Sequence, residues 1–213
     1  IIEETDLEST FVVEFPNASI RHGQFFEISL PKIGEAPISV SSFTDSTVEF
    51  TIRRVGKLTN VIFDLAPGDD LYIRGPYGNG FPLESFKNKH VVVIAGGTGV
   101  APVRSTLKHF LHHPQDCKDV YAIAGFRDPS HTLFENDLKA FVNAPHFHTT
   151  LTLDNGQKEG FKEGFAMNYV KDIPFQEWGE DYAVIIVGPP VMMKFTAQEC
   201  MKYGVQEEHI YVS

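Results

Sequence analysis

The segment VVVIAGGTGVAP, residues 91–102, constrains the fold more than any other part of this sequence. It opens as an unbroken apolar run, which is typical of a strand covered on both faces of a parallel sheet. Val100, Val103 and Leu107 then recur at the spacing of one helix face. The segment therefore predicts a strand, a glycine-rich loop and a helix in direct succession, as in the first unit of an α/β sheet.

The loop of this segment, AGGTGVAP (95–102), has the composition of a phosphate-binding loop. Glycine lets a backbone approach a pyrophosphate closely, and the start of a helix offers free N–H groups and positive potential. The loop is not the standard dinucleotide fingerprint, because Pro102 stands where that pattern has its third glycine, and no Gly-Lys-Ser/Thr follows to make a P-loop. A simple tight turn is the alternative. We favour phosphate binding because a second loop of this kind occurs.

That second loop is VGPPVMM (187–193), where an apolar strand again ends in glycine and proline before a helix. Loops that follow parallel strands meet at the carboxyl edge of the sheet, where ligands bind in such folds. The alternation of strands and helices continues through the C-terminal half. We therefore predict an α/β domain with a doubly wound parallel sheet over residues 89–213. Its other expected strands include VYAIAGF (120–126), HTTLTL (148–153) and HIYV (209–212).

Residues 1–88 have a different pattern, in which short β-like runs are separated by turn residues such as PN, HG and PG. Short strands at this spacing predict a small antiparallel barrel or sandwich. Pro37 at the start of one of these runs removes a backbone donor, which indicates an edge. We expect two domains, 1–88 and 89–213. The expected strands of the first are TFVVEF (10–15), FFEISL (25–30), ISVSSF (38–43), STVEFTIRR (46–54) and DLYIRG (70–75).

Composition limits the classes of partner. The chain has 18 Lys and Arg against 28 Asp and Glu, a net charge of −10, which argues against nucleic acid or an anionic membrane as the main partner. The longest apolar runs are far too short to span a bilayer, so we expect no membrane insertion. Two cysteines are too few for a disulfide framework, and a reduced cytoplasmic setting is expected.

A histidine group raises the question of a metal site. His109, His112 and His113 lie close to Cys117, at the end of an expected helix. Basic side chains are common there because they suit the helix dipole. We interpret the group as a solvated helix end and expect no metal. No Ser–His–Asp or Cys–His constellation can be assembled from the spacing.

The chain contains four motifs, in this order: VGKLT (55–59), GPYGNGF (75–81), AGGTGVAPVRS (95–105) and VGPP (187–190). In this order and at about this spacing they resemble the ferredoxin–NADP reductase superfamily over nearly the whole chain. Within it, GEAPISVS (34–41), GPYGNGFP and VGPPVMM are most similar to the B subunits of anaerobic sulfite reductases. The gamma subunits of sulfhydrogenases and the electron-transfer subunits of dihydroorotate dehydrogenases are also similar.

The resemblance implies an N-terminal FAD-binding antiparallel β-barrel and a C-terminal NAD(P)-binding domain, with the two rings stacked between them. It places the Ser39 hydroxyl near the flavin N5, which makes Ser39 the implied catalytic residue. A hydroxyl suits this place because it can donate or accept as the protonation of N5 changes. The implied flavin-binding residues are Pro37, Ile38, Ser39, Ile52, Arg53, Gly56, Lys57, Leu58 and Thr59. The implied nicotinamide-nucleotide residues are Gly97, Thr98, Gly99, Gly188, Pro189 and Pro190.

The chain departs from the family pattern in three places. Ala36 stands where the flavin strand usually carries an arginine that grips the FAD pyrophosphate, and Arg53, Arg54 or Lys57 could replace this cation. Val187 stands where a cysteine often precedes the Gly-Pro. Close relatives continue into a cysteine-rich segment that holds a [2Fe–2S] cluster. This chain has only two cysteines, so we expect such a cluster only in a longer form and not in this chain.

The residues after the expected strand 148–153 favour NADH as the donor, with NADPH possible. Relatives that use NADPH tend to present Ser-Arg there, whereas this chain has Asp154 and Asn155. A carboxylate repels a 2′-phosphate and accepts hydrogen bonds from a ribose diol. Arg127, after the expected strand 120–126, favours NADPH instead, because its positive charge would attract a 2′-phosphate.

The sequence thus predicts a flavin-dependent NAD(P)H oxidoreductase subunit that passes electrons from NADH through FAD to a partner redox subunit, by the nearest resemblance a sulfite reductase. An electron-transfer subunit of dihydroorotate dehydrogenase or a hydrogenase is the first alternative. The second alternative is a non-enzymatic assembly or regulatory subunit that keeps the nucleotide fold. Ala36 supports this alternative, because the arginine that usually binds the FAD pyrophosphate is missing.

Overall fold

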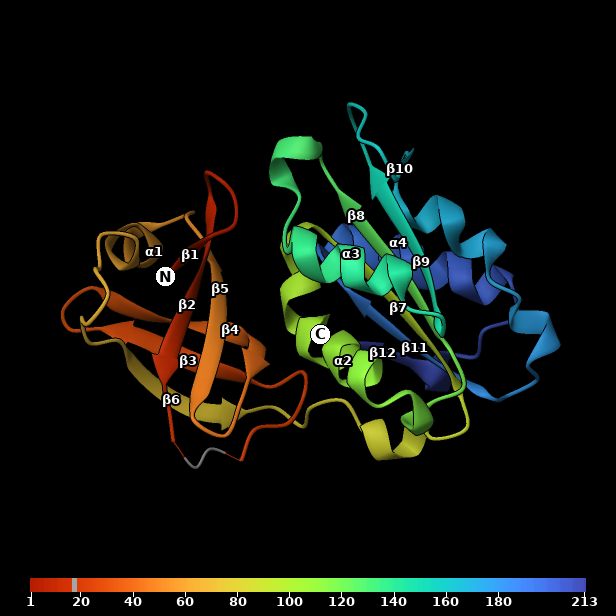
Figure 1. Ribbon diagram of the computed structural model, residues 1–213, viewed down its shortest axis with the longest axis horizontal. Coiled ribbons are helices and arrows are strands. Elements are labelled where there is room, and N and C mark those ends of the chain that lie inside the picture. Colours follow the sequence, from red (N-terminus) through yellow and green to blue (C-terminus); the bar gives the residue numbers. More distant parts are fainter. Residues whose placement is uncertain (17–18) are drawn as a thin grey trace. The chain divides into compact units, whose positions relative to one another are not determined.

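The structure is a computed structural model of the chain that describes residues 1–16 and 19–213. It divides into two compact units, Ile1–Phe81 (unit 1) and Pro82–Ser213 (unit 2), and each has its own hydrophobic core (Figure 1). The predicted domain boundary after residue 88 lies a few residues further along the chain. The assignment of one cofactor to each domain stays a prediction.

Unit 1 is a six-stranded antiparallel sheet in the order β1-β2-β5-β4-β3-β6, curled around an apolar core (Figure 1). Alternate residues such as Phe26 and Ile28 point inward and are fully buried, as the period of two along a strand requires. The helix α1 contributes the buried Ile62 to the same core. The bounds are β1 Ile2–Glu3, β2 Glu8–Glu14, β3 Phe25–Leu30, β4 Gly34–Phe43, β5 Thr47–Arg53, α1 Lys57–Ile62 and β6 Tyr72–Tyr77.

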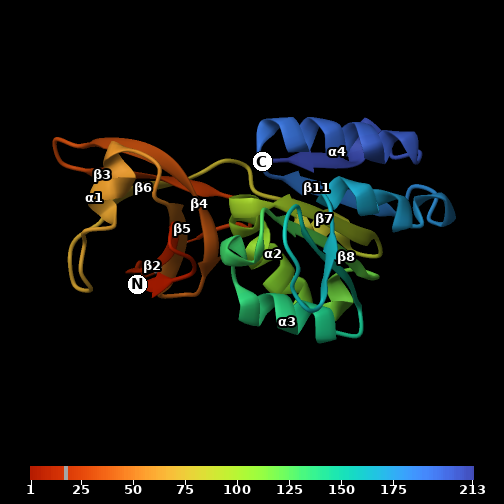
Figure 2. The ribbon, with the colours of Figure 1, turned by 90° about the horizontal axis from the view of Figure 1, so that it is seen from above.

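Unit 2 is a six-stranded parallel sheet in the order β10-β9-β8-β7-β11-β12. Helices α2 and α3 cover one face and α4 covers the other (Figure 2). All six residues of β11 are buried, which explains why the central strands appear in the sequence as continuous apolar runs. The strands are β7 His90–Gly96, β8 Val120–Phe126, β9 Phe147–Leu153, β10 Phe161–Glu163, β11 Tyr182–Val187 and β12 Ile210–Val212. The helices are α2 Val100–His112, α3 Glu135–Asn143 and α4 Pro190–Lys202.

Short 3-10 turns complete unit 2. They cover Leu83–Phe86, Gly97–Gly99, Pro114–Asp116, Pro129–His131, Ala166–Asp172, Phe175–Glu177 and Glu207–His209. The antiparallel sheet and the doubly wound parallel sheet confirm the predicted fold class. In unit 2 the strand order reverses between β7 and β11, and ligands bind at such a switch point in open α/β sheets.

Candidate functional site

In unit 1, the sheet opens along the first half of β4. Residues 34–39 pair with β3, whereas pairing with β5 starts only at Val40. From Thr51 to Arg53, β5 pairs with β2 on its other side. The two strands therefore diverge, and residues 34–39 have one edge that pairs with no other strand within the described part of the chain.

The direction of the backbone decides which groups face this opening. The Val40 N–H donates to the Gln24 carbonyl, just before β3, at 2.9 Å. Because hydrogen-bonding groups alternate in direction along a strand, positions 37 and 39 point the other way, into the opening. Pro37 therefore costs no ladder hydrogen bond, and the Ser39 N–H faces the open edge, whereas the Ser39 C=O lies where the pairing of Val40 with Phe50 begins.

The serines of β4 differ in what their hydroxyls can do. Ser41 is fully buried; its Oγ donates to the Glu49 carbonyl at 3.1 Å and accepts from the Thr51 hydroxyl at 3.0 Å. The half-buried Ser39 has no hydrogen bond from its hydroxyl to any described residue. The Ser39 hydroxyl is thus not used by the described residues, and its role toward a flavin stays a prediction.

The turn after β5 holds the predicted flavin loop, residues 56–59. The Thr59 Oγ1 accepts from the N–H groups of Val55 and Gly56, both at 2.9 Å. The Thr59 hydroxyl and the Gly56 N–H therefore stabilise the turn itself. Lys57 and Leu58 are the first two residues of α1, and their amides have no partner within the helix. Ile52 is 1% exposed, belongs to the core and pairs with Ser9 of β2, so its place in the flavin site stays a prediction.

The cations around this turn differ in their partners. The Arg53 Nε lies 3.4 Å from the Glu8 carboxylate, and the Glu8 side chain is only 4% exposed. Arg54 donates to the Asn60 side chain at 3.3 Å. Lys57 is exposed and forms no hydrogen bond or ion pair with the described residues. Of the three candidates to replace the cation missing at Ala36, Lys57 is the one without a hydrogen bond or ion pair to residues 1–16 and 19–213.

In unit 2, the two glycine loops lie together at the switch point of the sheet. They follow β7 and β11, which are neighbours in register from His90↔Tyr182 to Ala95↔Val187. A Cβ added at Gly99 would lie 2.5 Å from the Val187 carbonyl oxygen and 2.7 Å from the Gly188 Cα. The backbones of the two loops are therefore in direct contact; the sequence predicted that both lie at the carboxyl edge of the sheet.

Gly97 has a different reason to be glycine. Its φ is +55°, a left-handed backbone that glycine adopts without strain. A Cβ at Gly97 would meet nothing within 4 Å, so open space lies over this residue. Thr98 follows, half-buried, and α2 begins at Val100. On the other loop, Pro190 is the first residue of α4 and Pro189 precedes it.

The carboxyl ends of β8 and β9 meet beside these loops. The Asp154 N–H donates to the Phe126 carbonyl at 2.9 Å, and the Asn155 N–H donates to the Arg127 carbonyl at 2.8 Å. Partial desolvation raises the pKa of Asp154 above its ordinary value. Its carboxylate forms no ion pair with a described residue, which leaves it available to accept hydrogen bonds.

A second carboxylate at this corner was not singled out in the sequence. Asp128 accepts from His131 Nδ1 at 2.8 Å, from the Ser130 hydroxyl at 2.6 Å and from the Ser130 N–H at 3.0 Å. These bonds, that of His131 first, lower the pKa of Asp128 to about 2. The sequence signal is D-P-S, an acidic residue that caps the turn two residues on.

Replacing Asp128 with asparagine is expected to lower the melting temperature near neutral pH and to have no effect in strong acid. A carboxyl group with a depressed pKa stabilises the fold above its ordinary pKa of 3.8, and this contribution is lost as the pH falls to about 2. The difference between wild type and variant should shrink as the pH falls below about 4. Thermal unfolding followed by circular dichroism measures this. A difference that persisted at pH 2 would contradict the ionic origin.

Two of the histidines at the end of α2, His109 and His113, have protein partners. The His109 Nε2 lies 2.9 Å from the Asp116 carboxylate, and its ring stacks on His113 at 4.6 Å. Burial raises the pKa of the Cys117 thiol to about 12. Within residues 1–16 and 19–213, no group of three or more His, Cys, Asp or Glu side chains could hold a metal ion. In the same part of the chain, no helix is long and apolar enough to cross a membrane.

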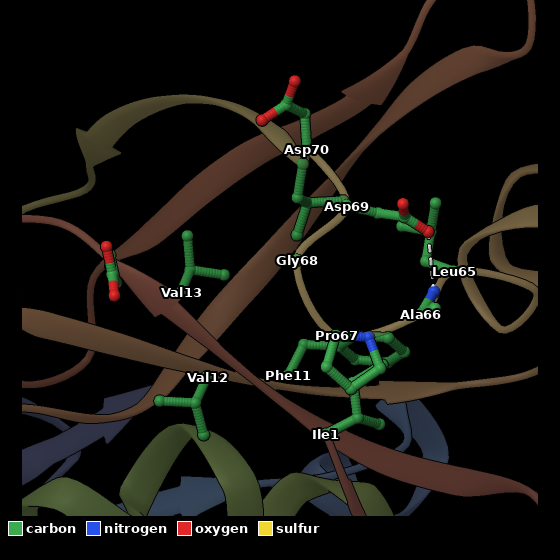
Figure 3. Close-up of a pocket in the computed structure, with 12 residues that line it drawn as sticks. Ile1, Phe11, Val12, Val13, Leu65, Ala66, Pro67, Gly68, Asp69 and Asp70 are labelled. Carbon is green, nitrogen blue, oxygen red and sulfur yellow. Dashed lines mark hydrogen bonds between the residues drawn. The ribbon is translucent and has the colours of Figure 1, made fainter.

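A pocket of about 540 Å³ in unit 1 is separate from the opening beside β4 (Figure 3). It lies between β2 and residues 65–71, with Ile1, Phe11 and Pro67 close together. The Ala66 N–H donates to the Asp69 carboxylate at 2.7 Å across its rim. None of the predicted flavin-binding residues lines it.

Known proteins are similar to this chain at two levels: a family model matches part of unit 2, and individual relatives match nearly the whole chain. Residues 93–198, all in unit 2, match the family described as oxidoreductase NAD-binding domain. Sulfhydrogenase 2 subunit gamma of Pyrococcus furiosus is 32% identical over 99% of this chain and 79% of its own. The electron transfer subunit of dihydroorotate dehydrogenase B (NAD(+)) from Clostridium perfringens is 32% identical over 96% of this chain and 75% of its own.

Among solved structures, a ferredoxin NADP+ reductase from Neisseria gonorrhoeae with bound FAD and NADP has the same two-domain fold. The TM-score is 0.81 at 20% identity, and the match covers 97% of this chain and 92% of that chain.

Proposed function

Because this chain belongs to the ferredoxin–NADP reductase superfamily, we propose that it is an electron-transfer subunit that takes reducing equivalents from NADH, through FAD, to a larger redox partner. The observation that carries the proposal is the contact between the two glycine loops at the switch point of the unit 2 sheet. Open α/β sheets bind nucleotides at this place.

The residues of unit 2 fit a nicotinamide nucleotide. The space over Gly97 admits a phosphate close to the backbone, and α2 directs its unpaired N–H groups toward the same loop. Gly97, Thr98 and Gly99 would hold the pyrophosphate. Gly188, Pro189 and Pro190 would lie against the nicotinamide end, where glycine allows close approach and the prolines keep the loop extended before α4.

The residues of unit 1 fit a flavin along the open edge of β4. A bound flavin would supply the ability to accept a hydride and to release electrons one at a time. Ser39 would offer its N–H and hydroxyl to the ring edge, and the Lys57 and Leu58 amides would bind the pyrophosphate. The full set assigned to FAD is Pro37, Ile38, Ser39, Ile52, Arg53, Gly56, Lys57, Leu58 and Thr59.

The charges at the corner of β8 and β9 support NADH over NADPH. Asp154 would accept hydrogen bonds from the adenosine ribose diol, and its charge would repel a 2′-phosphate. Asp128 adds a second negative charge there. The cation at this corner, Arg127, lies 3.9 Å from the Asp128 carboxylate, which offsets its attraction for a phosphate.

The acceptor is proposed to be a larger subunit of a redox enzyme. This rests on the two relatives above, which are named as subunits of a sulfhydrogenase and of a dihydroorotate dehydrogenase. Sulfite reductase, the partner expected from the motifs, stays a prediction. Reconstitution of the chain with each type of partner subunit, with NADH as the donor, distinguishes these acceptors by the substrate that is reduced.

The proposal predicts that the purified chain shows flavin absorption after addition of FAD, and that NADH bleaches it anaerobically much faster than NADPH. Asp154→Asn should reduce the preference for NADH about tenfold, because one like charge near the 2′-phosphate is removed. Glu159→Gln removes the same charge from the same loop and is the matched control. Stopped-flow absorbance measures both rates.

The outcomes separate the alternatives. Absence of flavin bands even with excess FAD would contradict the reductase and favour an assembly or regulatory subunit. Flavin that neither nucleotide bleaches would contradict the assigned donor. Equal effects of Asp154→Asn and Glu159→Gln would show that net charge, and not the place of Asp154, sets the preference.

A further inference from the structure

The Met192 side chain lies between the two glycine loops of unit 2. A Cβ added at Gly96 would be 3.3 Å from the Met192 Sδ, and one added at Gly188 would be 2.9 Å from the same sulfur atom. One side chain of α4 therefore contacts the backbone at the end of β7 and the backbone after β11. A larger residue at Gly188 or Gly96 would displace the thioether, by more at Gly188 than at Gly96.

The neighbouring Met193 provides a comparison. Both methionines are half-buried and pack against the same core cluster of unit 2. Within the described residues, the glycines whose added Cβ would contact a methionine, Gly96 and Gly188, both contact Met192 and not Met193. The two side chains thus have similar core packing, but of the two only Met192 contacts the glycines of the loops.

We propose that Met192 is a positioning residue that sets the spacing of the two loops and thereby the affinity of unit 2 for the nicotinamide nucleotide. This inference rests on the proposed function of these loops. Two backbone segments that must hold one ligand lose affinity when their spacing can vary, since misplacement by about 1 Å weakens a site severely. The thioether fills the space between them and keeps the Gly96 side and the Gly188 side at one separation.

Binding of NAD+ to the purified chain, measured by calorimetry, tests the proposal without turnover. Met192→Ala should weaken binding about tenfold, because the space between the loops is left empty. Met192→Leu has a similar volume and should stay within about twofold of wild type. Met193→Ala removes the same number of atoms from the same helix and should also stay within about twofold.

A second measurement reports on the place of the side chain directly. The chain has 4 methionines, so labelling with methyl-¹³C-methionine gives few resonances, and Met192→Leu assigns the one of interest. Addition of NAD+ should shift the Met192 methyl resonance and leave those of Met167 and Met201 in place.

Equal losses of affinity in Met192→Ala and Met193→Ala would overturn the proposal, because general packing would then explain both. Unchanged affinity in Met192→Ala would overturn it as well. If wild type does not bind NAD+, the proposed function of the loops fails and the inference fails with it. Binding by wild type with no effect of Met192→Ala leaves the proposed function intact and rejects only the role of Met192.

Discussion

Replacing Gly99 with alanine is expected to weaken NAD+ binding more than about tenfold and to destabilise unit 2 by about 1–3 kcal/mol. The added Cβ would lie 2.5 Å from the Val187 carbonyl oxygen and 2.7 Å from the Gly188 Cα. Both are backbone atoms at the end of a fully buried strand, so they cannot move as a flexible side chain can. The two loops must separate to admit the methyl group. Calorimetric titration with NAD+ and urea unfolding measure the two effects.

Two other glycines of the same loops are matched controls. Gly188→Ala places its Cβ 2.9 Å from the Met192 sulfur atom, and this side chain can move, so a smaller loss is expected. Gly97→Ala meets no atom within 4 Å, so its loss of unfolding stability should come from the left-handed backbone alone, about 1–2 kcal/mol. It is a control for stability and not for NAD+ affinity, because its Cβ would enter the space assigned to the phosphate. Wild-type affinity in Gly99→Ala would contradict the close contact of the loops.

Replacing Arg53 with methionine is expected to destabilise unit 1 by about 2 kcal/mol. The Glu8 carboxylate is 4% exposed, and the Arg53 Nε at 3.4 Å is its cation. Removal of the cation leaves the buried Glu8 carboxylate with the Thr5 hydroxyl as a donor but without an opposite charge, which costs more than the pair contributes. The expected loss of unfolding free energy is smaller than for a fully buried ion pair because the Arg53 side chain is 40% exposed. Urea unfolding followed by fluorescence measures the change.

The double variant Glu8→Gln/Arg53→Met should recover part of this loss, because no charge then remains buried. Lys57→Ala is the control at the same turn: its side chain is exposed, so stability should stay within about 0.5 kcal/mol. We expect Lys57→Ala to weaken FAD binding, since Lys57 is the cation left to replace the one missing at Ala36. Lost stability in Lys57→Ala, or unchanged stability in Arg53→Met, would contradict this division of roles.

The parallel half of the fold could be predicted because its signals are local. A strand buried on both faces needs apolar residues at every position, so 91–95 and 183–187 stand out, and they form the centre of β7 and most of β11. Glycine marks the first loop because Gly97 has a left-handed backbone and Gly99 has no room for a Cβ beside Val187. The carboxyl edge follows from the parallel order of the strands alone.

Two short elements could not be predicted. α1 spans six residues, Lys57–Ile62, which is too short for a helical period to show in the sequence. It is stabilised by the Thr59 hydroxyl, which caps the turn, and by the burial of Ile62 in the core. β10 has three residues and depends on its pairing with β9.

By itself, the sequence determined which residue types stand at each motif: the glycines of both loops, Pro37 and Ser39 on an open strand, and an alanine in place of a cation. The tertiary structure decided which of these groups are free to act. Arg53 is engaged by Glu8 across the β2–β5 pair, Ser41 is engaged by β5, and Met192 joins loops that follow different strands. Such contacts join residues far apart in the chain. They depend on strand register and on packing between elements, and these cannot be read from a short stretch of sequence.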